Sequence, residues 1–120
     1  MTVALFQIVH EKDKERVSFE NYENTIAWAG KIDPDIYDPV WTGEVKDPNE
    51  AGEVFADLEE LYYILNAGDK PEGYRGRSMS VSDVVVAGDK AYFTDSIGFR
   101  EIAPEGFIEK VPAAVDRCTV

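Results

Sequence analysis

The stretch from Ser78 to Phe99, SMSVSDVVVAGDKAYFTDSIGF, decides the fold. β-branched and aromatic residues predict one strand around 84–86 and another around 92–94. Between them, Gly88-Asp89 suits a two-residue hairpin loop with a positive φ at the glycine. The register that follows pairs Ala87 with Lys90, Val85 with Tyr92 and Val84 with Phe93.

The same register extends to the polar residues beyond the strands. It places Ser82 opposite Asp95 and Asp83 opposite Thr94, so we expect each carboxylate to bond with a hydroxyl across the hairpin. The two aspartates then lie on opposite faces, which disfavours a shared acid–base or metal site. We expect them to fix strand ends and turns.

The flanking sequence predicts further elements. Residues 3–9 are apolar on both faces apart from Gln7, which is typical of an interior strand. Ser18 is expected to cap a helix that ends at Gly30. Pro39 makes the strand over 36–45 an edge strand. On it we expect Tyr37, Trp41 and Val45 to share one side. Asp47 and Pro48 predict a second helix over 49–66. Residues 107–111 are expected to form a short edge strand.

The order β-α-β-α-β-β indicates an α+β fold. We expect a mostly antiparallel sheet of four to five strands with two helices packed on one face. Residues 1–102 form the predicted domain, and 103–120 a weakly structured C-terminal extension.

Composition excludes several classes of function. The 120 residues carry a net charge of −12, and an acidic chain is a poor binder of nucleic-acid phosphates. The single cysteine, Cys118, excludes an intramolecular disulfide and a multi-cysteine metal site. With no membrane-length apolar run and no signal peptide, we expect a cytoplasmic protein without membrane contact, metal or cofactor.

The loop Tyr74-Arg75-Gly76-Arg77, which leads into Ser78, is the first candidate for function. Arginine and tyrosine dominate the hot spots of protein interfaces, so this loop is expected to contact a protein partner. The alternative is that the arginines pair with acids of the same molecule. His10, the lone histidine, is expected to be a solvated residue at a strand end.

A second candidate is an acidic stripe on the predicted helix over 49–66. The stripe is either a solvated face or an imitation of DNA phosphates. Its residues are Glu50, Glu53, Asp57 and Glu60.

The sequence GYRGRSMSVSDVVV followed by GDKAYFTDSIGF resembles the signature of the YodL-like domain. This is a small bacterial domain found alone and inside large proteins of mobile and conjugative elements. The resemblance covers roughly residues 6–99. Its pattern falls on Gly76, Ser78, Ser80, Val81, Ser82, Asp83, Val84, Tyr92, Asp95, Ser96, Gly98 and Phe99.

The resemblance implies no enzymatic activity. In the family, a basic residue often precedes the first serine of the motif, and Arg77 matches that position without being able to transfer a proton. We therefore expect a non-enzymatic bacterial interaction or regulatory module that binds an unidentified protein. The alternatives are an acidic antirestriction-type inhibitor that mimics DNA, and an enzyme with an unrecognised pocket. The oligomeric state stays open.

Overall fold

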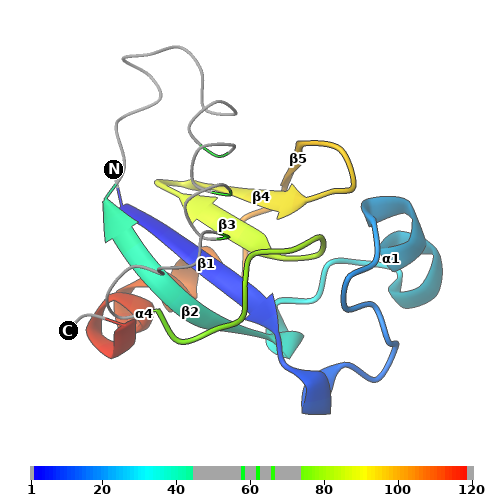
Figure 1. The fold of residues 1–120 in the computed structure, drawn as a ribbon, viewed down its shortest axis with the longest axis horizontal. Coiled ribbons are helices and arrows are strands. Elements are labelled where there is room, and N and C mark those ends of the chain that lie inside the picture. Colours follow the sequence, from blue (N-terminus) through cyan, green and yellow to red (C-terminus); the bar gives the residue numbers. More distant parts are fainter. Residues whose placement is uncertain (1, 45–57, 59–61, 63–65, 67–73, 119–120) are drawn as a thin grey trace.

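The computed structural model describes residues 2–44, 58, 62, 66 and 74–118. These residues form a five-stranded antiparallel sheet with the strand order β2-β1-β3-β4-β5 and two α-helices (Figure 1). The strands are β1 (Thr2–Ile8), β2 (Tyr37–Glu44), β3 (Val84–Ala87), β4 (Lys90–Thr94) and β5 (Phe99–Ile102). The helices are α1 (Tyr22–Ala29) and α4 (Val111–Cys118), with 3-10 turns η1 (His10–Lys12), η2 (Pro34–Ile36) and η3 (Ile108–Lys110).

The predicted α+β class is confirmed, but the predicted element order β-α-β-α-β-β is wrong. The elements bounded above run β-α-β-β-β-β-α, with the helical residues Leu58 and Tyr62 between β2 and β3. The prediction did not include the strand β5 and the helix α4, which follow the hairpin. The hairpin register itself is confirmed: Val84 lies opposite Phe93, Val85 opposite Tyr92 and Ala87 opposite Lys90. Gly88 has the positive φ, 63°, that its loop requires.

β1 is the interior strand that its apolar sequence predicts, since it pairs with both β2 and β3. Its alternate residues point to opposite sides of the sheet. The side of Val3 and Leu5, here the Leu5 face, packs with Trp41, Met79, Val85 and Tyr92. The side of Ala4, Phe6 and Ile8, here the Phe6 face, packs with Val17, Tyr37, Val84, Phe93 and Phe107.

β2 is the predicted edge strand, but Tyr37 and Trp41 do not share a side. Leu5 pairs with Trp41 and Phe6 with Pro39, so Val40 is an extra residue that interrupts the register. Such a bulge shifts the alternation by one position. Tyr37 is therefore buried on the Phe6 face and Trp41 on the Leu5 face. Val45 lies outside the described residues.

The first helix begins three residues later than predicted. Asn21 is its N-cap, with a side chain that accepts from the N–H of Asn24 at 2.8 Å. Ser18 instead donates its N–H and its hydroxyl to the carboxylate of Asp13. The predicted end is confirmed, because Gly30 has a φ of 80° and donates its N–H to Ile26.

The sequence predicted that the helices pack on one face of the sheet, but helical residues lie on both faces. Tyr22 of α1 and Val111 of α4 pack against the Phe6 face, whereas Leu58 and Tyr62 pack against the Leu5 face. Leu58 and Tyr62 are helical, and most of the predicted helix over 49–66 lies outside the described residues. α1 and α4 are at opposite ends of the sheet (Figure 1).

The C-terminal prediction is also wrong. Residues 107–111 form no strand, and the expected weakly structured extension contains η3 and α4. Phe107 anchors this segment, because its ring contacts Phe6 at 5.6 Å and Tyr37 at 5.1 Å between centroids. The burial of Phe107 could not be predicted from the sequence, because a single buried aromatic residue creates no periodic pattern.

Candidate functional site

The site begins with Gln7, the single polar residue that β1 buries. Its amide nitrogen donates to the carbonyl of Arg77 at 2.9 Å and to Oδ2 of Asp83 at 3.0 Å. Its amide oxygen accepts from the N–H of Arg77 at 3.1 Å. One side chain therefore holds the loop 74–78 against the end of the sheet and also binds the buried carboxylate.

Gly76 lets the loop approach this closely. A Cβ added at this position would lie 2.2 Å from Oε1 of Gln7 and 2.8 Å from Cβ of Val40. The bulge of β2 supports the same loop, because the carbonyl of Val40 accepts from the N–H of Arg75 at 2.8 Å. The hydroxyl of Tyr74 donates to the carbonyl of Arg77. The loop is thus a fixed part of the sheet edge.

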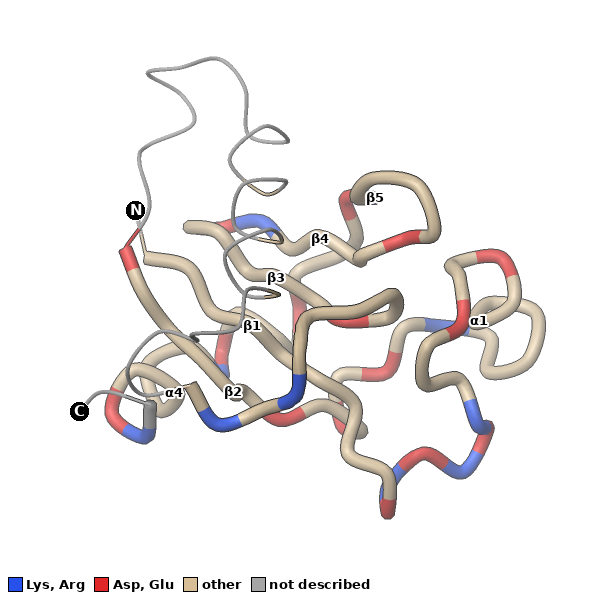
Figure 2. The backbone as a smooth tube through the Cα atoms, in the orientation of Figure 1, with Lys and Arg blue, Asp and Glu red and all other residues tan. Residues whose placement is uncertain are grey.

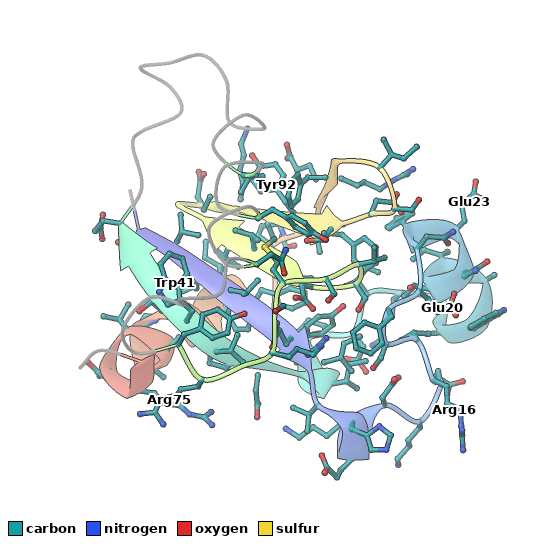
Figure 3. The ribbon with its side chains drawn as sticks, in the orientation of Figure 1. Arg16, Glu20, Glu23, Trp41, Arg75 and Tyr92 are labelled. Atoms are coloured by element: carbon teal, nitrogen blue, oxygen red, sulfur yellow. The ribbon has the colours of Figure 1, made fainter. Side chains whose placement is uncertain are left out.

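The two arginines of the loop have different surroundings. Arg75 is exposed, and its side chain extends away from the sheet (Figure 3). Arg77 binds Oδ1 of Asp83 through its Nη2 at 3.0 Å and remains 33% exposed. The proposed pairing of arginine with an acid of the same molecule is therefore confirmed for Arg77. In Figure 2 the segment that leads into β3 is basic, within a chain whose net charge is −12.

Asp83 is a fully buried carboxylate with an unusual pKa. Burial raises its pKa to about 6, although the N–H of Ser80, the charge of Arg77 and the amide of Gln7 act in the opposite direction. Tyr74 is affected as well, because burial and the charge of Asp83 raise its pKa to about 12. Shifted titrations of this kind gather at functional sites more often than elsewhere.

Phe19 completes the cluster from a different segment. Its ring lies under the guanidinium of Arg77, with 4.7 Å between Cζ and the ring centroid, and 57% of the residue is exposed. Its N–H donates to the hydroxyl of Ser82 at 2.9 Å. Phe19 and Ser82 both have positive φ, 67° and 83°. Such backbone strain also concentrates at functional sites.

The expected bonds between aspartates and hydroxyls across the hairpin are wrong. Asp83 binds Gln7, Arg77 and Ser80, and the buried hydroxyl of Thr94 has no partner in the described part of the chain. The backbones of Asp83 and Thr94 are still paired, since the N–H of Thr94 donates to the carbonyl of Asp83 at 2.8 Å. The carboxylate itself binds the guanidinium of Arg77, a charged donor that forms a stronger hydrogen bond than a neutral hydroxyl.

Asp95 forms a separate, structural group. Its Oδ1 accepts from the N–H of Tyr22 at 3.1 Å and of Ser96 at 2.9 Å. Its backbone N–H donates to Gly98, whose φ is +71°. It also lines a small hollow of about 180 Å³ with Ser96, Gly98 and Phe99. Asp83 and Asp95 thus have different partners, in agreement with their predicted separation.

Among the remaining candidates, Ser80 contributes through its backbone N–H, which donates to Oδ2 of Asp83 at 2.9 Å. Ser80 donates its hydroxyl to the carbonyl of Ser78, and His10 is an exposed residue at the end of β1. Glu50, Glu53, Asp57 and Glu60 lie outside the described residues. Within residues 2–44 and 74–118, no cluster of His, Cys, Asp and Glu could hold a metal ion. No helix in the described part of the chain is long and apolar enough to span a membrane.

Gln7 and Phe19 are the site residues that sequence reasoning missed. Gln7 interrupts an otherwise apolar buried strand, and a buried polar side chain requires hydrogen-bond partners, so this signal was available. Phe19 falls at the start of the helix that the sequence predicts after Ser18, where nothing marks it as a partner of Arg77. Its position under Arg77 depends on contacts between segments far apart in the chain.

Comparison with protein-family models matches residues 2–105 to the YodL-like domain. The match covers most of the chain, so this protein belongs to the YodL-like domain family. A search of the curated proteins and a search of the solved structures each returned no match.

Proposed function

We propose that this YodL-like domain is a non-enzymatic interaction module that binds an acidic segment of a partner protein. The proposed surface consists of Phe19, Arg75 and Arg77. The observation that carries the proposal is the fixed position of Arg77, stacked on an exposed aromatic ring and bound by a buried carboxylate. Arginine and aromatic residues of this kind supply most of the affinity at protein interfaces.

The rigidity of the loop supports this reading. Gln7 and Val40 hold the backbone of the loop in place, so little conformational entropy is lost when a partner binds. Arg75, two residues before Arg77 in the same loop, adds an exposed positive charge. The buried Asp83 orients the guanidinium of Arg77, a role that needs no catalytic step. A bacterial cytoplasmic location and a link to mobile elements remain predictions.

The structure changes how the proposal is tested. Replacing Arg77 with an acid would place a second carboxylate beside Asp83 and disturb the fold, so Arg75→Glu is the informative variant. After the partner has been identified by cross-linking in cells and purified, we expect Arg75→Glu to weaken its binding by about tenfold or more in calorimetry.

Lys14→Glu is the matched control, because it makes the same change of charge at an exposed position outside the loop 74–78. Its affinity should stay within about twofold of the parent chain. Equal affinities for the parent chain, Arg75→Glu and Lys14→Glu would disprove the proposed surface.

A further inference from the structure

β5 is an edge of the sheet, and no described strand pairs with its outer side. Outside its pairing with β4, no backbone hydrogen bond joins Phe99–Ile102 to another described segment. An edge strand of this kind offers N–H and C=O groups to an extended chain. The opposite edge, β2, is blunted by Pro39 and by the bulge at Val40.

A groove of about 710 Å³ lies beside β5, between the segment 101–105 and α1. Tyr22 and Ile26, one turn apart on α1, form one wall with Ile32 after the helix. Ile102 contributes from β5, and three charged residues, Lys31, Glu101 and Glu105, also line the groove. Glu101 alternates with Ile102 along β5, and its carboxylate lies 4.0 Å from Nζ of Lys90 at the exposed surface. The groove therefore combines apolar side chains with two acidic residues and one lysine next to an open strand edge.

We propose that β5 binds an extended peptide segment of another protein as an added sixth strand. Backbone bonds to β5 would supply affinity, and alternate side chains would enter the groove and supply specificity. The residue opposite Ile102 would be apolar, and the residue opposite Glu101 would be lysine or arginine. This surface lies at the edge of the sheet opposite to the loop 74–78, so it does not depend on the function proposed above.

Charge disfavours a second copy of this chain as the occupant. In an antiparallel pair of β5 strands related by a two-fold axis normal to the sheet, opposed residues lie on the same face. The two registers with the most overlap therefore place Arg100 opposite Arg100, or Glu101 opposite Glu101. Like charges directly opposite each other destabilise a strand pair. A basic peptide avoids this repulsion and complements the net charge of −12.

The test begins with a random dodecapeptide library displayed on phage and selected on the purified full chain. The strongest clone is synthesised and titrated while backbone amide signals are followed by NMR. We expect enriched peptides in which apolar and basic residues alternate, and shifts at 99–102 and in α1. Glu101→Lys should weaken binding by about tenfold, whereas Asp116→Lys, the same charge change on the exposed side of α4, should not.

A peptide methylated at alternate backbone nitrogens on its pairing edge should lose binding, because it cannot donate to β5. The proposal is overturned if no peptide is enriched, if the shifts fall around Arg75 instead, or if Glu101→Lys binds normally. A dimer joined through β5 in sedimentation would also overturn it. Arg75→Glu should leave this peptide's affinity unchanged, which separates this surface from the loop 74–78.

Discussion

At the residue scale, Gln7 and Asp83 are polar groups buried at the end of the sheet, each within 3% of complete burial. Both are tolerated because their partners are provided. Asp83 accepts from Ser80, Gln7 and Arg77, and Gln7 uses both ends of its amide on the loop. Removing one partner would leave a buried polar group unsatisfied, which costs about 1–3 kcal/mol.

The titration of Asp83 gives the first prediction. Its pKa is about 6 in the folded chain against 3.8 for the ordinary side chain, so the folded state binds the proton more tightly. The contribution of Asp83 to stability is therefore greatest below about pH 4 and falls as pH rises through 6, by about 3 kcal/mol.

Urea unfolding between pH 4 and pH 7 checks this prediction, with Asp83→Asn as the non-titrating reference. The parent chain should lose stability relative to the variant as pH rises. A constant difference in the free energy of unfolding would contradict it. The comparison with Asp83→Asn is needed because Asp13 has the opposite effect on stability. Hydrogen bonds from Ser18 and Val17 lower the pKa of Asp13 despite its partial burial, so its contribution to stability increases as pH rises.

At the element scale, local rules predicted the strands better than the helix starts. The hairpin register followed from β-branched residues around Gly88-Asp89 and was confirmed. Ser18 and Asn21 are both good N-caps by residue type. The choice between them was made by Asp13, which engages Ser18, and by Ser82, which binds Phe19 and holds the chain outside the helix.

The N-cap gives the second prediction. Asn21→Ala should destabilise the protein by about 1 kcal/mol, because the N–H of Asn24 loses its acceptor. Asn21→Ser should restore most of that loss. Thermal unfolding measures the effect, and amide exchange across α1 locates it. If Asn21→Ala unfolds at the same temperature as the parent chain, Asn21 is not the cap.

At the scale of the whole molecule, the two faces of the sheet are closed by segments far apart in sequence. α1 and the segment 107–118 cover the Phe6 face, while Leu58 and Tyr62 contribute to the Leu5 face. α4 contacts β2 and β1, so the C-terminal segment belongs to the same folded unit as the sheet. The family match ends at residue 105. The helix α4, which completes the cover of the Phe6 face, lies beyond that residue.

This arrangement gives the third prediction. Phe107→Ala should cost about 3–5 kcal/mol, because it leaves a cavity against Phe6 and Tyr37. Val115→Ala, at an exposed position in α4, should cost less than about 1 kcal/mol. Chemical denaturation of the two variants measures both losses in the free energy of unfolding. Similar, small effects would indicate the loosely held C-terminal segment that the sequence suggested.

The sequence by itself determined the hairpin, its register, the interior and edge strands, the α+β class and the family. Those features depend on residues close together in the chain, whose spacing and backbone preferences act locally. Tertiary structure decided which arginine is paired, where the first helix starts, which side Trp41 takes and how the C-terminal segment folds. Some of these depend on partners far along the chain, such as Gln7 for the loop and Tyr37 for Phe107. Others depend on nearby residues, such as Asp83 for Arg77 and Asp13 for Ser18, whose contacts form only when the surrounding fold positions both groups. No local pattern records such a partner, because contact and burial exist only after the chain has folded.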